Sequence, residues 1–227
     1  MSVIELKNVN LNYPIYNLSR SLRSVLLGKG LQVQFIPALK NINLSLKKGE
    51  RLGLMGNNGC GKTTLLKIIG GIYYPSSGEV SVKEKPLSLF DISMGLNLDA
   101  TGIENIFILG YLRDLSKNDI QSRIDDIIDF AEIKNFSNLP CHTYSAGMKI
   151  RLATAIALNM EPNLLLIDEF FGAGDSKFLE KSRIALVKKV EKIDNLIFAS
   201  HNRTLINNIC NRLITLENGK IVEDIKI

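Results

Sequence analysis

Residues 56–63 read Gly56-Asn57-Asn58-Gly59-Cys60-Gly61-Lys62-Thr63, which fits the pattern G-x-x-x-x-G-K-(S/T). A strand at 51–55 is expected before this stretch and a helix to about Ile69 after it, which is the context that the pattern requires. The glycines let backbone N–H groups converge on an anion, and the positive end of the helix dipole adds to the attraction. The stretch therefore predicts a phosphate-binding loop in an α/β sheet.

The polar side chains of this loop have expected roles. Lys62 is expected to reach the β- and γ-phosphates of a nucleotide, and the Thr63 hydroxyl to bind Mg²⁺. The alternative is a glycine-rich turn that matches the pattern by accident, which would leave the strand and the helix on either side unexplained. The predicted nucleotide-binding set covers the loop and the residue after it: Gly56, Asn57, Asn58, Gly59, Cys60, Gly61, Lys62, Thr63 and Thr64.

A second strand ends in two carboxylates, in the stretch Leu164-Leu165-Leu166-Ile167-Asp168-Glu169. A continuous apolar strand is typical of a parallel sheet covered on both faces, and such sheets bind ligands at the carboxyl ends of their strands. We expect Asp168 to hold Mg²⁺, directly or through water, and Glu169 to polarise the attacking water. Without the upstream loop, the same pair would be interpreted as an acidic turn in solvent.

A histidine follows a third strand, expected at 196–200. His201 would then lie at the same edge of the sheet, within reach of a γ-phosphate. A histidine after a strand is by itself more often a polar loop residue, so this assignment depends on the phosphate loop.

The periodicity of the chain predicts an α/β fold. Strands are expected at 3–10, 39–46, 51–55, 79–82, 86–90, 164–167, 196–200, 212–216 and 219–224, and helices at about 63–69, 102–131, 146–159, 178–191 and 204–210. Their alternation indicates one domain with a core formed by 1–91 and 159–227 and a helix-only insertion at about 92–158. Residues 6–11 (LKNVNL) nearly repeat at 39–44 (LKNINL), which we interpret as similar strand chemistry rather than duplication.

The composition excludes several classes of protein. With 227 residues, 45% of them hydrophobic and 22% charged, the chain can bury a core and is unlike disordered or collagen-like sequences. Its apolar runs are far shorter than the roughly 20 residues that span a bilayer, and it begins without a secretion signal. Cys60, Cys141 and Cys210 have no metal-ligand spacing and are expected to be reduced thiols. The net charge of +5 is not concentrated in a basic run and supports nucleic-acid binding only weakly.

The order of the motifs resembles that of the ATP-binding-cassette (ABC) ATPases over nearly the whole chain. After the loop come Tyr144-Ser145-Ala146-Gly147-Met148, Asp168-Glu169, Gly172-Ala173-Gly174-Asp175 and His201. The resemblance implies a P-loop NTPase (RecA-like) cassette with an N-terminal antiparallel β subdomain and an inserted α-helical subdomain. It also implies ATP and Mg²⁺ as ligands and ATP hydrolysis as the activity.

The resemblance further implies roles for single residues. Ser145 and Gly147 belong to the signature motif, which binds the γ-phosphate held by a second subunit, so that two cassettes form a homodimer around two ATPs. The helix expected after Ser145 has no acidic residue in its first turn, which keeps that end electropositive. Asp175 is the D-loop aspartate at the interface, and His201 contacts the γ-phosphate. An aromatic residue near the N-terminus stacks on adenine; Tyr13 fits best, Tyr16 is the alternative, and either fits as well as a packing residue at a strand end.

Departures from the common pattern resemble one branch of the family, the ATPase subunits of exporters for lipid-linked polysaccharides such as O-antigen, capsule and teichoic acid. That branch reads Tyr-Ser-(Ser/Ala)-Gly-Met where Leu-Ser-Gly-Gly-Gln is usual, as at 144–148, and has Phe soon after the D-loop, as in Gly174-Asp175-Ser176-Lys177-Phe178. It also carries Thr-Gly-x-Glu-Asn, here Thr101-Gly102-Ile103-Glu104-Asn105. Relatives place a short helix near the membrane face, here at about 19–27; the alternative is a solvated helix packed on its own domain.

The branch also implies partners. Integral membrane permease subunits would bind the cassette at the cytoplasmic face of the inner membrane, and the polysaccharide would be reached through them. The sequence stops at Ile227, so no carbohydrate-binding domain is expected after the cassette. No glutamine lies where the Q-loop should be, and Asp91 occupies roughly that place. Nucleic acid is not an expected partner; an ABC ATPase that acts on nucleic acid or ribosomes is the alternative, although such relatives usually carry tandem cassettes or coiled-coil arms.

Overall fold

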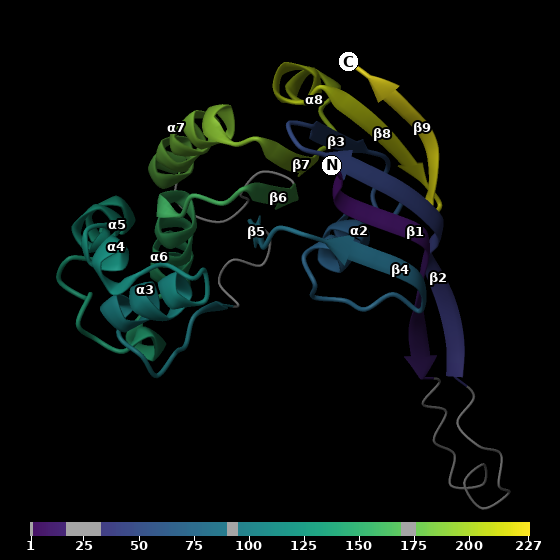
Figure 1. Cartoon of the computed structure of the whole chain (residues 1–227). Helices are drawn as coiled ribbons and strands as arrows, with labels where there is room; N and C mark the ends of the chain where they lie inside the picture. The colour runs from purple at the N-terminus through teal and green to yellow at the C-terminus, as the bar shows by residue number, and fades with distance from the viewer. Residues whose placement is uncertain (1, 17–32, 90–94, 169–175) are drawn as a thin grey trace, which may run out of the picture.

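The computed structural model describes residues 2–16, 33–89, 95–168 and 176–227. The strands are β1 (Ser2–Tyr16), β2 (Val33–Lys47), β3 (Arg51–Met55), β4 (Ser77–Val82), β5 (Pro86–Ser88), β6 (Leu164–Asp168), β7 (Asn195–Ala199), β8 (Arg212–Glu217) and β9 (Lys220–Lys226). The helices are α2 (Lys62–Ile69), α3 (Gly102–Tyr111), α4 (Lys117–Gln121), α5 (Ile124–Ala131), the 3-10 helix η2 (Cys141–Thr143), α6 (Ala146–Asn159), α7 (Ser176–Lys192) and α8 (Arg203–Ile209). Figure 1 shows the strands on one side of the molecule and α3–α6 on the other.

The main sheet has six strands in the order β5-β6-β7-β3-β8-β9. All neighbours in it run parallel except β8 and β9, which form an antiparallel hairpin. Successive side chains of β6 point to opposite faces: Leu164 and Leu166 join one buried cluster, and Leu165 and Ile167 join the other. Because both faces of the sheet are covered, the first four residues of this strand are apolar and buried, as the sequence predicts.

Helix α2 is enclosed between the main sheet and a second, three-stranded sheet of order β2-β1-β4. Its buried face consists of Leu65, Leu66, Ile68 and Ile69, which pack in one cluster with side chains of both sheets. Burial of this face anchors the helix that starts within the predicted phosphate loop.

The first two strands extend well beyond their expected bounds of 3–10 and 39–46. They pair antiparallel as far as Tyr16 and Val33, and the hairpin projects from the body of the molecule in Figure 1. Near its tip Phe35 is 63% exposed and Ile36 52% exposed. The expected bounds were wrong because the outer half of this ribbon is held by backbone pairing rather than burial, and it therefore lacks the alternation that marks a half-buried strand.

The near-repeat in these strands forms a pair of matching backbone irregularities. Asn8 and Asn41 both adopt the left-handed conformation, with φ of 51° and 50°. The Asn43 side chain accepts a hydrogen bond from the Asn8 N–H at 2.9 Å, and the Asn10 side chain accepts one from the Asn41 N–H at 2.8 Å. The repeated Asn-x-Asn pattern thus has a structural role: the second asparagine of each copy accepts a hydrogen bond from the backbone N–H of the left-handed asparagine in the other copy.

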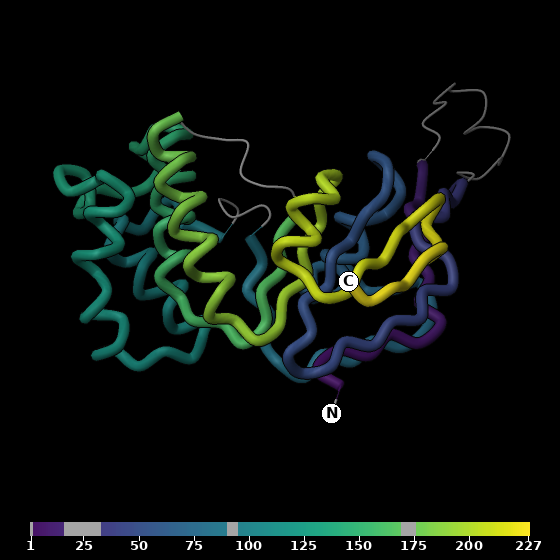
Figure 2. Tube along the Cα trace, turned by 90° about the horizontal axis from the view of Figure 1, so that it is seen from above, coloured from purple at the N-terminus to yellow at the C-terminus, as the bar shows by residue number. Residues whose placement is uncertain are grey.

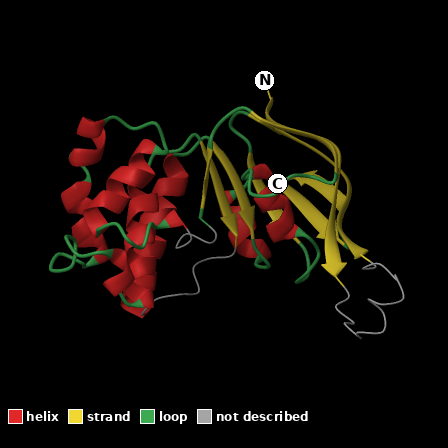
Figure 3. Ribbon diagram, turned by 90° about the horizontal axis from the view of Figure 1, so that it is seen from below, coloured by secondary structure: helices red, strands yellow, loops and turns green. Residues whose placement is uncertain are grey.

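Helices α3–α6 gather beyond the β5 edge of the main sheet, and α7 connects them to the strands. Figure 2 shows the resulting elongated molecule, and Figure 3 shows how the helices separate from the strands, with α2 and α8 as the exceptions beside the sheets. Helix α6 contacts α3, α5 and α7 and carries a fully buried stretch from Leu152 to Ala157. Within the described ranges, every helix is either too short or too polar to serve as a membrane span.

Candidate functional site

The carboxyl ends of three neighbouring strands bring the predicted motifs to one edge of the main sheet. Strand pairing places Asp168 of β6 beside Ala199 of β7, and Ala199 beside Leu54 of β3. The phosphate loop begins directly after β3, and His201 follows β7 after a single intervening residue. These three groups therefore leave the sheet at the same level, where α/β sheets bind their ligands.

The backbone of the loop takes conformations that its glycines allow. Gly56, Gly59 and Gly61 have φ of 146°, 80° and 112°. A Cβ on Gly56 would lie 2.3 Å from the Leu216 carbonyl oxygen, and one on Gly61 would lie 2.8 Å from a Leu39 methyl carbon. The glycines at 56 and 61 are therefore required by space as well as by backbone angle.

Lys62 lies inside the curve of this loop. Its side chain is only 7% exposed, and its ammonium donates hydrogen bonds to the Gly56 carbonyl at 2.7 Å and to the Asn57 carbonyl at 3.2 Å. Buried cations are costly unless they are paired, so the loop carbonyls hold this charge in place. The ammonium is thereby fixed where a phosphate on the loop would meet it.

The start of α2 suits an anion from outside the chain. The helix has no acidic residue in its first turn and no side-chain cap at its N-terminus. Its first N–H groups and its dipole are thus left for an external negative charge. Thr63 next to Lys62 is exposed, and Asp168 is half-buried at the same edge. Hydroxyl and carboxylate oxygens are donors that Mg²⁺ prefers, so the described residues fit a nucleotide with its metal ion.

Tyr13 contacts the helix that follows the loop. Its hydroxyl oxygen lies 3.1 Å from the hydroxyl oxygen of Thr64, and its ring meets the ring of Tyr73 edge-on at a centroid distance of 6.0 Å. The side chain is 38% exposed. Tyr16 lies three residues further along the same strand, in the last described pair with Val33. Of the two candidate tyrosines, Tyr13 is the one with a described contact to α2.

Ser145 begins helix α6 and caps it. Its hydroxyl accepts a hydrogen bond from the Met148 N–H at 3.2 Å, and the first turn of the helix has no acidic residue. The helix end that looks bare in the sequence is thus capped by the signature serine itself. Figure 1 shows α6 with the helices beyond β5, whereas α2 lies under the centre of the sheet. Within one chain, the signature motif and the phosphate loop therefore belong to separate parts of the molecule.

Two segments before this helix are bound tightly to each other, and together we call them the clamp: residues 97–105 and 136–144. Three backbone N–H groups of Ile103, Cys141 and His142 donate across the clamp to the carbonyls of Ser137, Ala100 and Leu98, at 3.1, 2.8 and 2.7 Å. The clamp joins the start of α3 to the residues that lead into the signature motif.

Asn105 fastens one side of the clamp from within. This residue is fully buried, and its side-chain amide accepts a hydrogen bond from the Asn97 N–H at 2.8 Å. It donates to the carbonyls of Asn97, Ala100 and Thr101 and to the Cys141 sulfur. The sequence marks it only as the last residue of Thr-Gly-x-Glu-Asn; its burial is what identifies it as a structural centre.

Tyr144 fastens the other side. Its side chain is 4% exposed, and its hydroxyl donates a hydrogen bond to the Phe136 carbonyl at 2.7 Å. Burial raises the pKa of the Tyr144 phenol to about 12, so the hydroxyl remains a donor at neutral pH. A Cβ on Gly102 would lie 2.5 Å from the Tyr144 hydroxyl oxygen. The two sequence features that mark the branch are therefore in contact.

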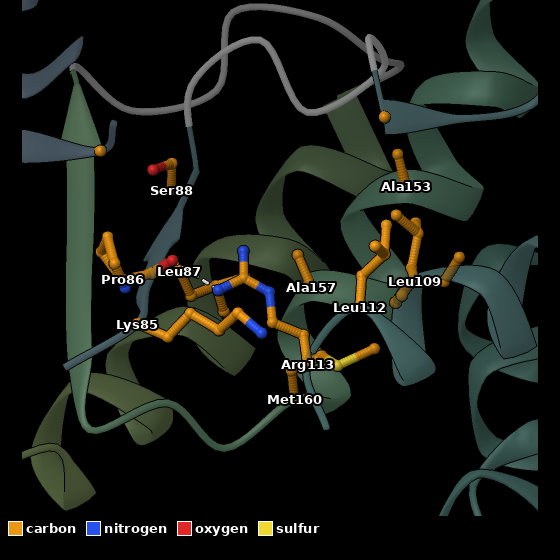
Figure 4. A pocket seen from close by; sticks show the side chains of 13 residues that line it. Lys85, Pro86, Leu87, Ser88, Leu109, Leu112, Arg113, Ala153, Ala157 and Met160 are labelled. Carbon is orange, nitrogen blue, oxygen red and sulfur yellow. Dashed lines mark hydrogen bonds between the residues drawn. The ribbon is translucent and has the colours of Figure 1, made fainter. Parts of the chain in front are cut away.

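A cavity of about 350 Å³ separates the β5 edge of the sheet from α3 and α6. Figure 4 shows Arg113, just after α3, reaching across it toward Pro86 of β5, where the guanidinium donates a hydrogen bond to the Pro86 carbonyl. Leu87, Leu109 and Ala157 are among the apolar side chains that line it. The helices and the sheet are thus joined here by a polar contact across the cavity, in addition to the buried cluster that Leu87 of β5 shares with Ile106 of α3.

Some expected residues lie outside the described ranges. These are Glu169, Asp175, Asp91 and the helix expected at about 19–27. The structure therefore places the phosphate loop, Asp168 and His201 at one edge and Ser145 and Gly147 elsewhere, and the roles of these residues remain predictions.

Comparisons with known proteins agree with this architecture. A family model described as ABC transporter matches residues 39–172. The O-antigen export system ATP-binding protein RfbE of Yersinia enterocolitica is 40% identical over 99% of this chain and 98% of its own length. The teichoic acids export ATP-binding protein TagH of Bacillus cereus is 37% identical over 97% of this chain, which spans only 40% of TagH.

A solved structure gives the same result for the fold. A dimeric post-hydrolysis state of the ATP-binding cassette MJ0796, bound to ADP and Pi, superposes with a TM-score of 0.71 at 27% identity and covers 98% of both chains. The motif order, the sheet topology and these similarities lead to one conclusion: the chain belongs to the ABC transporter family and is one of its ATP-hydrolysing cassettes.

Proposed function

We propose that this cassette powers the export of a lipid-linked polysaccharide of the O-antigen, capsule or teichoic acid type across the cytoplasmic membrane. The observation that carries the proposal is the 40% identity with an O-antigen export ATPase along essentially the full length of both proteins. The signature Tyr144 and the Thr-Gly-x-Glu-Asn segment, which resemble the same branch, support it. The similarity to a teichoic acid export protein extends the range of polymers without selecting one.

In this proposal the chain has two working parts, a core of residues 1–91 and 159–227 and a helical part of about 92–158. The phosphate loop, which precedes α2, belongs to the first and Ser145, which precedes α6, to the second; Figure 1 shows α2 beside the strands and α6 among the helices. A second copy, turned head to tail, would bring its own Ser145 to the phosphates on this loop. The dimeric state of the related cassette MJ0796 supports such an arrangement.

Each residue then has a task in the hydrolysis of ATP to ADP and phosphate. Lys62 and the loop N–H groups bind the β- and γ-phosphates, and Tyr13 stacks on the adenine. Thr63 and Asp168 would hold Mg²⁺, which neutralises phosphate charge when bound. Ser145 and Gly147 of the other copy close the site over the γ-phosphate.

The remaining assignments concern the attack itself. Glu169 orients and polarises the water that attacks the γ-phosphorus, and His201 contacts the γ-phosphate from the same sheet edge. Asp175 lies between the two copies. The opening that follows hydrolysis is the motion that the permease would use.

The cassette would work as a peripheral subunit, bound to integral membrane permease subunits at the cytoplasmic face of the inner membrane. The names of its relatives as ATP-binding proteins of export systems support this location. The polysaccharide would meet the permease rather than the cassette. Nucleic acid has no place in this proposal.

The test is co-purification from its native cells, followed by assay of the complex. We expect a polytopic membrane protein to co-purify with the chain and ATP turnover to respond to lipid-linked polysaccharide. Deletion of the gene should leave the polymer on the cytoplasmic side. Stimulation by DNA or ribosomes without a membrane partner would overturn the proposal and favour a cassette that acts on nucleic acid.

A further inference from the structure

We infer that the clamp sets the position of Ser145, so that Gly102 and Tyr144 are positioning residues for the contact between the signature motif and the nucleotide of the second subunit. This inference rests on the proposed function of Ser145. It adds two buried residues of the clamp, and it gives a physical reason why both carry the identity that the branch shares.

Ser145 and Ala146 are exposed, between Tyr144, which is buried, and Met148, which packs against the core. A Cβ on Gly147 would meet only the Ser145 hydroxyl among the described atoms considered, at 3.9 Å, which leaves this turn open on its outer side. Ser145 uses its hydroxyl to cap its own helix. The position of the serine is therefore set on one side by α6, which it caps, and on the other side by the residue that precedes it.

That preceding residue is Tyr144, which is fixed at two points. Its hydroxyl is bound to the Phe136 carbonyl at 2.7 Å, and its backbone N–H donates to the Cys141 carbonyl at 3.1 Å. Cys141 is itself bonded to Ala100 and to the Asn105 amide. A displacement at Gly102, in the first turn of α3, is thus passed through the clamp to Tyr144 and from there to Ser145.

Gly102 is the residue at which the clamp leaves no room for a side chain. It is the first residue of α3, where alanine would ordinarily stabilise the helix, by about 1 kcal/mol relative to glycine in a helix interior. A methyl group there would lie 2.5 Å from the Tyr144 hydroxyl oxygen and 3.1 Å from the Ser137 carbonyl oxygen. Leucine, the usual first residue of the signature, has no hydroxyl at this point. A tyrosine at position 144 therefore requires a glycine at position 102, because the tyrosine hydroxyl occupies the space that a larger side chain at 102 would need.

The experiment measures ATP-driven dimerisation by light scattering in the Glu169→Gln background, together with binding of a fluorescent ATP analogue to the monomer. Gly102→Ala should raise the ATP concentration for half-maximal dimerisation on the order of tenfold, since about 1 Å of misplacement costs up to about a hundredfold at a positioned group. Its affinity for the analogue should stay unchanged. Tyr144→Phe alone should also raise the ATP concentration for half-maximal dimerisation, because it removes the hydroxyl bond to the Phe136 carbonyl that fixes Tyr144.

Gly110→Ala is the matched control at the other end of the same helix. A Cβ there would lie 2.6 Å from Ile120, so it strains the helix without touching the clamp. The inference predicts wild-type dimerisation for this variant. An equal shift in Gly110→Ala would show a general loss of structure, and wild-type dimerisation of Tyr144→Phe would show that the hydroxyl does not position Ser145; either result overturns the inference.

Ser145→Arg separates this inference from the proposed function. If Ser145→Arg abolishes dimerisation while Gly102→Ala dimerises at the wild-type ATP concentration, the clamp has no positioning role and the proposed function stands. If Ser145→Arg dimerises normally, the proposed role of the signature motif is wrong, and the inference fails with it.

Discussion

The hydroxyl oxygens of Tyr13 and Thr64 lie 3.1 Å apart, which ties the first strand to the helix of the phosphate loop. The contact holds the Tyr13 ring beside the loop, where an adenine can stack on it. Tyr13→Ala should weaken ATP binding on the order of tenfold, because stacking of a base on an aromatic ring contributes about 1–3 kcal/mol. Tyr13→Phe should bind nearly as well as the wild type.

Titration with a fluorescent ATP analogue measures both variants, and Tyr16→Ala is the control. Equal affinities of Tyr13→Ala and the wild type, with a loss in Tyr16→Ala, would transfer the adenine contact to Tyr16.

Lys62 is held by the carbonyls of its own loop, at 2.7 Å from Gly56 and 3.2 Å from Asn57. Lys62→Met should lower nucleotide affinity by more than about tenfold, because a charge-assisted hydrogen bond contributes about 1.5–3 kcal/mol. Lys48→Met removes an exposed ammonium in the turn before β3 and should bind ATP normally. Calorimetric titration with ATP compares the two, and similar affinities would argue against the phosphate contact.

Asn8 and Asn41 adopt the left-handed conformation in the three-stranded sheet. Asn8→Ala should lower the free energy of unfolding by about 1–2 kcal/mol, since residues other than Gly, Asn and Asp adopt this conformation at that cost. Asn8→Gly should lose less. Denaturant unfolding measures the difference, with Asn12→Ala as a control in the same strand. Equal stability of the alanine and glycine variants at position 8 would contradict the assignment of strain.

Lys189 donates a hydrogen bond to the Leu158 carbonyl at 3.0 Å, at the C-terminal end of α6, which has no basic residue in its own last turn. The pKa of Lys189 is lowered from 10.5 to about 8, mainly by burial; Glu161 opposes the shift, and Arg123 and Lys192 add to it. Between these two values the unfolded chain keeps the proton that the folded chain has released. The free energy of unfolding should therefore rise with pH across this interval through Lys189.

The measurement is denaturant unfolding of the wild type and of Lys189→Met across that interval. The wild type should gain stability relative to Lys189→Met as the pH rises, whereas Lys188→Met, which alters an exposed neighbour, should keep a constant difference. Parallel curves for the wild type and Lys189→Met would contradict the lowered pKa.

The sequence predicts most of the site because its chemistry is local. The phosphate loop at Gly56–Thr63 can be predicted from the types and spacing of its residues. The alternation of strands and helices predicts a parallel sheet, in which the strand ends before the loop and at Asp168 lie at the same edge. The same reasoning does not find the clamp, because the contact between Gly102 and Tyr144 depends on how two distant segments pack. Spacing also cannot show that Ser145 caps its own helix, or that the near-repeat at Asn8 and Asn41 is a reciprocal pair of hydrogen bonds.

The extent of the first hairpin escapes prediction for a different reason. Burial imposes a pattern on a strand, and side chains such as Phe35 in the outer half of the ribbon are exposed. Tyr16 and Val33 are paired through their backbones, and backbone pairing without burial leaves only a weak pattern in the sequence of side chains.

The central claim is that one site is built from two copies of the chain, with Lys62 from one and Ser145 from the other. Its most direct test is the mass of Glu169→Gln in solution, with ATP and with ADP. Because we propose that Glu169 polarises the attacking water, its loss should reduce hydrolysis by about 100-fold or more, so that the ATP-bound state accumulates. We predict twice the 25.2 kDa of one chain with ATP, the mass of one chain with ADP, and no dimer when Ser145→Arg is added. A monomer at every ATP concentration, or a dimer that Ser145→Arg leaves intact, would contradict the claim.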